Sequence, residues 1–380
     1  MRMKQITLCT FFLLCLGSMP LWAPHGEEGQ TQENTKFVAA AANSSALQTK
    51  TPAVAKSLPR KVLMSRPEPF VLDWQSLRTL QSTKPEDAEA KEKLLKHAAR
   101  TVNLFIEGNT QCPLVLPDNT TMLMKPFVNV RSLTITSVDS VELPLLPCPQ
   151  KLESLMTYRV TLMSTRNIQR HSCLRELALD HMSFDTTGQH PNQTDRLAVL
   201  AKLNNLRELH VDLHDGTPIE EKLFERIVQN NPQITDFNYR GVVTEGFVRS
   251  LGTLPLVTLQ LRDSQIDDVK FALLPFNTLQ IFHLGGEHNL KDLTPLQGAP
   301  LCVLALACYT HVDEAFFQAI RSMQTLEEFY LSSGSLTDEQ GELFLRWAQE
   351  LSSLHLTCSR GFSEEMCEKL RKAFGKRARV

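Results

Sequence analysis

Polar side chains able to bind another molecule recur at alternate positions in a series of short segments. These residues are His210, Asp212, Asn238, Arg240, Gln260, Arg262, His283 and Tyr330. Arginine and tyrosine are frequent anchors of protein interfaces, and the charged groups around them help to select the partner. We therefore predict that these residues bind a protein partner.

Apolar residues separate these polar positions in a fixed pattern. Ten segments begin with an aliphatic residue and carry an apolar residue again at position 4, and nearly all do so at position 6. They are VRSLTI (130–135), LESLMT (152–157), LRELAL (174–179), LRELHV (206–211), ITDFNY (234–239), LVTLQL (256–261), LQIFHL (279–284), LCVLAL (301–306), LEEFYL (326–331) and LSSLHL (351–356). In an extended strand, positions 4 and 6 face one side and positions 3, 5 and 7 the other. Each segment is thus predicted to bury positions 4 and 6 and to expose polar residues such as Gln260.

The starts of successive segments are 22 to 32 residues apart. Self-similarity at such a period is typical of a solenoid, in which the strands pair in parallel and the chain crosses back outside them. The pattern L-x-x-L-x-L over residues 126–375 resembles the leucine-rich repeat. The resemblance implies an α/β solenoid of about ten repeats, a curved parallel sheet with helices and turns on the convex side. None of the segments has asparagine at position 9, where many leucine-rich repeats do, so no subfamily is assigned.

The crossovers between strands differ in length. Apolar periodicity predicts helices at 219–229, 312–323, 338–350 and 364–374, whereas 267–275 is too short for more than a turn or two. Residues 67–125 are predicted to form an N-terminal helical cap. It would hold a helix at 86–100, capped by Thr83, and a strand at 101–106. Residues 376–380 form a basic tail.

The first 23 residues have the features of a signal peptide: Arg2 and Lys4, then an apolar stretch, then small residues ending at Ala23. Residues 24–66 lack apolar periodicity and are predicted to be a flexible leader. The chain is therefore expected to be secreted, periplasmic or at the cell surface, with no further membrane insertion. An uncleaved N-terminal anchor is the alternative.

The remaining residues favour no catalytic chemistry. The motifs of zinc proteases, serine hydrolases and phosphate-binding loops are missing, and His25 with Glu27 and Glu28 is more typical of a solvated stretch than of a metal site. A net charge of −2 gives no reason to expect nucleic acid. We expect a monomeric binding protein without cofactor or metal. The alternatives are a tethered envelope or matrix protein and, more weakly, an adaptor similar to the F-box leucine-rich-repeat proteins.

Seven cysteines follow the signal segment. Cys308 and Cys358 are expected two repeats apart, about 9–10 Å, which is too far for a disulfide. Cys358 with Cys367 and Cys148 with Cys173 stay possible pairs. Most of the cysteines are predicted to be buried as small apolar residues.

Two arginines occupy position 7 of consecutive strands. The Cβ atoms of Arg240 and Arg262 are thus expected about 5 Å apart. Asp212 has the same position one repeat earlier and is expected to neutralise Arg240 in part, which would leave Arg262 the freer of the two to attract an acidic group of a partner.

Overall fold

The computed structural model describes residues 69–380, apart from 109–113, 116–123, 140, 143–145, 165, 185–196, 214–217, 287–289, 310, 334, 348–353 and 359. The predicted signal peptide and leader therefore lie outside the described residues. No helix in the described part of the chain is long and apolar enough to cross a membrane.

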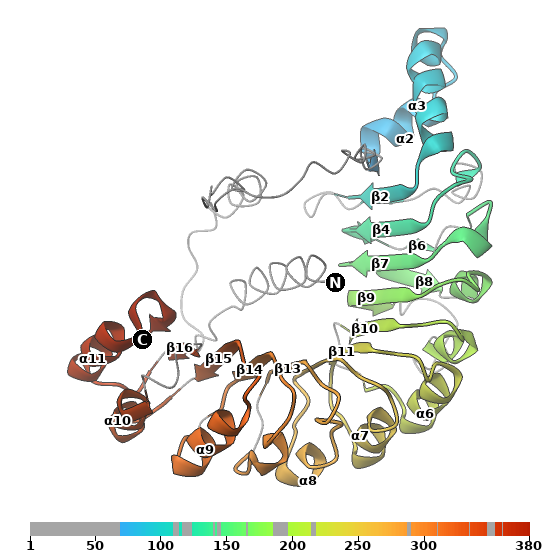
Figure 1. The fold of residues 1–380 in the computed structure, drawn as a ribbon. Helices are drawn as coiled ribbons and strands as arrows, with labels where there is room; N and C mark the ends of the chain where they lie inside the picture. Colours follow the sequence, from blue (N-terminus) through green and yellow to red (C-terminus); the bar gives the residue numbers. More distant parts are fainter. Residues whose placement is uncertain are drawn as a thin grey trace, which may run out of the picture. The chain divides into compact units, whose positions relative to one another are not determined.

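Parallel strands, one from each repeat, form a single large sheet. In order along the sheet they are β1 (Phe70–Leu72), β2 (Asn103–Glu107), β4 (Ser132–Thr136), β7 (Ser154–Tyr158), β9 (Glu176–Phe184), β10 (Glu208–Leu213), β11 (Asp236–Arg240), β12 (Thr258–Arg262), β13 (Ile281–Leu284), β14 (Val303–Ala307), β15 (Glu328–Ser333), β16 (Leu354–Cys358) and β17 (Ala378–Arg379). Short strands β6 (Val141–Glu142) and β8 (Thr161–Ser164) pair at its side, and β3 (Leu114–Val115) pairs with β5 (Val138–Asp139). The strands of the repeats line the inner side of an arc, with the crossovers outside (Figure 1). The predicted leucine-rich-repeat solenoid is confirmed, and its sheet extends on both sides of residues 126–375.

The crossovers change character along the chain. Several are 3-10 turns: η2 (Pro149–Lys151), η3 (Arg166–Arg170), η4 (Ala198–Lys202) and η5 (Thr294–Leu296). The others are helices: α6 (Glu221–Asn230), α7 (Glu245–Leu251), α8 (Asp268–Phe271), α9 (Glu314–Ser322), α10 (Asp338–Trp347) and α11 (Glu364–Phe374). The four predicted crossover helices are confirmed to within a few residues, and α7 is an addition. Its N-cap is Thr244, whose side chain accepts from the Phe247 amide.

The N-terminal region holds α2 (Trp74–Gln81), the 3-10 turn η1 (Pro85–Asp87) and α3 (Ala88–Arg100). The predicted capping role of Thr83 is wrong. The N-cap residues are Lys84 for η1 and Asp87 for α3, and neither caps with its side chain. Ser82, the C-cap of α2, donates its hydroxyl to Asp87 Oδ2 at 2.5 Å and accepts from the Lys84 amide at 3.2 Å. Since Pro85 makes the first turn a 3-10 turn, the helix proper begins later than the spacing from Thr83 suggested.

The core lies between the sheet and the crossovers, where strand positions 4 and 6 point. Leu177, Leu179, Leu304 and Leu306 are all fully buried, as their positions predict. Aromatic rings from the crossovers fill the space behind them. The Phe224 ring of α6 stacks on a ring of α7, with centroids 3.7 Å apart. The repeats thus share one continuous apolar layer, and none of them could bury its own strand alone.

Most of the repeats have a left-handed backbone residue at position 8, which follows the strand except in β9, where His181 lies inside the strand. Ser137, Arg159, His181, Asp263 and Cys308 have φ between 47° and 60°, and glycine takes this place at 241 and 286. The amide of this residue joins one repeat to the next, as from Asp263 N to Gly285 O at 3.0 Å. Main-chain bonds therefore run along the turn in which other leucine-rich repeats use asparagine.

The prediction that most cysteines are buried is wrong for the described ones. Cys358 is buried, whereas Cys173 and Cys308 are exposed and the others are half-buried. Cys367 lies in α11, and Cys358, at the end of β16, is part of the core. Neither possible pairing, Cys358 with Cys367 or Cys148 with Cys173, is formed.

Candidate partner-binding face and acidic cluster

The predicted site residues form two rows across the inner face of the sheet. His210, Asn238, Gln260 and His283 pair in register from β10 to β13. Asp212, Arg240 and Arg262 form the adjacent row. Tyr330 lies further along, since β14 separates its strand from that of His283. The register brings together seven of the eight predicted residues.

Three of these residues are buried, contrary to the expectation that this face is exposed. The exposed fraction is 5% for Gln260, 6% for Asp212 and 7% for His283. Neighbouring strands lie only about 4.8 Å apart, so long side chains in one row cover each other. Arg262 is part of this cover, because its Nη2 lies 3.5 Å from Gln260 Oε1. The half-exposed residues are His210, Asn238, Arg240, Arg262 and Tyr330.

Arg240 is held by two carboxylates. Its Nε donates to Asp263 Oδ2 at 2.7 Å, and its Nη1 lies 3.7 Å from Asp212 Oδ2. Burial alone would lower the pKa of Arg240, but the bond to Asp263 and the charge of Asp212 outweigh it and raise the pKa. The sequence predicted the partner Asp212 and missed Asp263. Asp263 is at position 8, and its left-handed φ of 53° turns its side chain back toward the strand row.

Two histidines of the inner face, His210 and His283, are held uncharged. Burial lowers the pKa of His210 to about 4, and the charge of Arg262 adds to this effect while Asp236 opposes it. Burial lowers the pKa of His283 to about 3, again with a contribution from Arg262. Near neutral pH both rings are therefore polar but neutral, and Arg262 is a cationic centre between them.

Tyr330 stacks on His355 of the next strand, with ring centroids 4.7 Å apart. Its hydroxyl donates to Glu328 Oε2 at 2.8 Å. The ring is thus fixed from two sides while staying half-exposed, which suits an aromatic anchor.

An acidic cluster that the sequence analysis did not identify lies at the middle of β9 and the end of β10. Asp180, His181 and Asp212 each place one ligand atom so that these atoms lie within 4.8 Å of one another. Burial raises the pKa of Asp180, and the negative charge of Asp212 raises it further. The Tyr158 ring meets the His181 ring edge-on at 5.6 Å. Asp180 and His181 are adjacent in sequence, so a strict strand alternation would have placed them on opposite faces.

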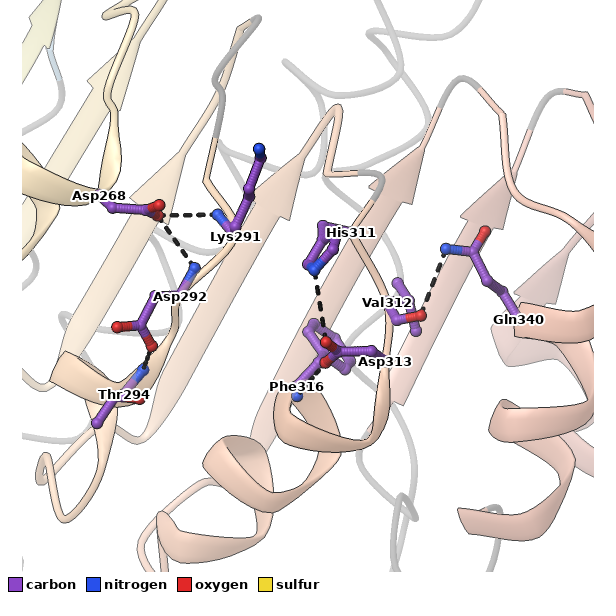
Figure 2. A network of polar contacts seen from close by, with 9 residues as sticks. All are labelled: Asp268, Lys291, Asp292, Thr294, His311, Val312, Asp313, Phe316 and Gln340. Atoms are coloured by element: carbon purple, nitrogen blue, oxygen red, sulfur yellow. Dashed lines mark hydrogen bonds and ion pairs between the residues drawn. The ribbon is translucent and has the colours of Figure 1, made fainter.

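A second polar network joins repeats at the start of the crossovers (Figure 2). Asp268 Oδ1 accepts from the amides of Lys291 and Asp292 in the next repeat, at 2.8 and 3.0 Å. Asp313 caps α9 by accepting from the Phe316 amide, and its other oxygen lies 3.4 Å from His311 Nε2. These side chains bond mainly to backbone amides, so the network ties repeats together and is a structural feature rather than a candidate active site.

The class of fold follows from this arrangement: one strand in each repeat, one parallel sheet and crossovers on the outer side define a leucine-rich-repeat solenoid. No protein-family model matches the sequence, and no curated protein matches it.

Solved structures with a similar fold come from several bacteria. An internalin, InlF, from Listeria monocytogenes is 15% identical over 74% of each chain, with a TM-score of 0.47. A leucine-rich-repeat protein from Leptospira interrogans is 16% identical over 75% of this chain and 97% of its own, with a TM-score of 0.33. The leucine-rich-repeat protein LegL7 from Legionella pneumophila is 13% identical over 80% and 90%, with a TM-score of 0.35. At these identities the likeness concerns the fold alone.

Proposed function

We propose that this chain is an exported scaffold that binds a protein partner through the inner face of its sheet, without catalysis. The observation that carries the proposal is that half-exposed polar side chains of β10, β11 and β12 lie in register on this face: His210, Asn238, Arg240 and Arg262. A sheet holds such side chains rigidly, so that binding loses less conformational entropy than it would on a mobile loop. Export is proposed from the sequence of residues 1–23.

Arg262 and Tyr330 are the residues we propose as anchors. Arg240 is a weaker candidate because Asp263 and Asp212 already balance its charge. Arg262 lies between two neutral histidines, and both His210 and His283 respond to its charge. A partner carrying an acidic group would therefore be attracted to this part of the face, and its association should weaken as salt rises.

The test begins with capture of a partner by the purified protein, followed by titration of that partner. Arg262→Glu should weaken binding by about 2 kcal/mol, roughly a 30-fold rise in Kd. Arg226→Glu is the matched control, because Arg226 is exposed on α6, outside the sheet. Equal affinities for both variants, with unchanged circular dichroism, would place the binding surface elsewhere. Cell fractionation with N-terminal sequencing of the mature protein tests export and cleavage.

A further inference from the structure

We infer that Asp180, His181 and Asp212 form a binding site for a divalent transition-metal ion of the Zn²⁺ type. The three residues come from two neighbouring repeats and lie at the end of the inner face. Two carboxylate oxygens and one imidazole nitrogen lie within 4.8 Å of one another. The inference is independent of the proposed protein partner.

A β-bulge brings these side chains together. The register of β9 with β10 pairs Leu179 with Val211 and then, after a shift, Met182 with Leu213. Two residues of β9, Asp180 and His181, therefore oppose the single residue Asp212. Bulges of this kind re-aim a side chain, and His181 has the left-handed backbone that the change of direction needs, with φ 47°. The bulge thus allows two adjacent residues to face the same carboxylate.

The burial of the Asp212 carboxylate without a hydrogen bond is a second, independent observation. The Asp212 side chain is 9% exposed, and neither of its carboxylate oxygens has a hydrogen-bond partner within the described residues. The ion pair of Asp212 Oδ2 with Arg240 Nη1 is 3.7 Å long, beyond hydrogen-bond distance, and Arg240 already donates to Asp263. A buried carboxylate without hydrogen bonds costs free energy, which a bound cation would recover.

The ligand set selects the class of ion. Mg²⁺ and Ca²⁺ prefer oxygen ligands alone, whereas Zn²⁺ binds imidazole nitrogen and carboxylate oxygen together. Bonds of about 2.0–2.2 Å place neighbouring ligand atoms about 3.3 Å apart. Asp180 and His181 are half-buried, and modest rotations of their side chains would close the remaining distance. Three protein ligands leave a fourth position of the ion for water.

Two facing carboxylates have another way to relieve their repulsion, which is to share one proton. The positive charges of Arg240 and Arg262 repel a metal ion, so the shared proton has to be tested against the metal site. The two explanations differ in what they require of His181. A shared proton does not need the imidazole, whereas the metal site does.

The experiment uses the full-length protein, treated with a chelator and dialysed, and titrates it calorimetrically with Zn²⁺. The wild type should take up one ion at this site and gain thermal stability by mass action. His181→Asn and Asp212→Asn should each weaken Zn²⁺ binding at least about tenfold. Even the loss of a residue that only hydrogen-bonds to a metal ligand lowers metal affinity by about that factor. Asparagine is chosen at position 181 because it tolerates left-handed backbone, so the variant keeps the bulge.

Glu225→Gln is the matched control: it removes an exposed carboxylate of α6, outside the sheet and away from the three ligands, and it should bind Zn²⁺ as the wild type does. Co²⁺ absorption spectra separate this site from thiolates such as Cys173, because a nitrogen and oxygen site lacks the intense sulfur charge-transfer band. No saturable uptake by the wild type, or equal uptake by the wild type and both ligand variants, would overturn the inference. An increase in stability of Asp212→Asn over a wild type that binds no Zn²⁺ would establish the shared proton instead.

Discussion

At the scale of single residues, polar side chains of the inner face hold one another in place. Arg240 lies beside Arg262 and Asp212 in one row, and the Arg262 side chain reaches over Gln260 of the other row. Burial of Gln260 depends on how neighbouring rows cover one another, which one strand's pattern does not contain. The bond between Asp263 and Arg240 depends on the left-handed backbone of Asp263, which no local sequence motif predicts.

The lowered pKa of His283 predicts how the stability of the fold depends on pH. The folded pKa of about 3 lies below the ordinary value of 6.5, so between these values the unfolded chain binds a proton that the folded chain does not. The free energy of unfolding therefore falls as the pH is lowered through this window, by up to about 2 kcal/mol at pH 5. His283→Gln should flatten this part of the curve of stability against pH, measured by urea denaturation. A slope in His283→Gln equal to that of the wild type would contradict the assignment.

At the scale of elements, strands and helices were predictable for different reasons. Apolar residues at positions 4 and 6 marked the strands because every repeat must bury the same face. Helices such as α9 and α11 were marked by their own period, but the short α7 was missed because it spans only Glu245–Leu251. The bulge of β9 could not be predicted, since it is a property of pairing with β10 and not of either strand alone.

Asp268 tests how adjacent elements are joined. Its carboxylate accepts two amides of the following repeat, so Asp268→Ala leaves both without this partner. We expect a loss of about 1–2 kcal/mol in the free energy of unfolding, moderated by water that reaches the exposed turn. Glu339→Ala removes an exposed carboxylate from the first turn of α10 and should change stability by less than about 0.5 kcal/mol. Chemical denaturation of both variants gives the comparison; equal losses would show that the network of Figure 2 does not stabilise the array.

At the scale of the whole molecule, the repeat explains both the fold and its cooperativity. In the part of the chain that the structure describes, each strand on the main path of the sheet pairs with the strands of the adjacent repeats, so stability depends on the array being continuous. The period of 22 to 32 residues was sufficient to predict this architecture. The partner face was predicted only in part, because side chains from several repeats decide together which residues stay accessible.

Truncation tests this continuity. A chain ending after Gly298 loses β14 to β17 and exposes the apolar layer beside β13, so its melting temperature should fall by at least about 10 °C. Deletion of residues 24–66, which have no apolar periodicity, should shift it by no more than about 2 °C. Differential scanning calorimetry measures both. A large shift for the second variant would mean that the repeat domain begins earlier in the chain.

The left-handed residue at position 8 has a consequence for the history of such chains. Main-chain amides such as that of Asp263 link successive turns. The geometry of the coil therefore depends on the left-handed backbone torsion at position 8 and not on one particular side chain. Serine, arginine, histidine, aspartate, cysteine and glycine all occupy this place. Substitutions there and at position 9 can therefore remove a recognisable consensus sequence while the coil persists. The spacing of the apolar positions is then a better guide to common ancestry than the residue types at positions 8 and 9.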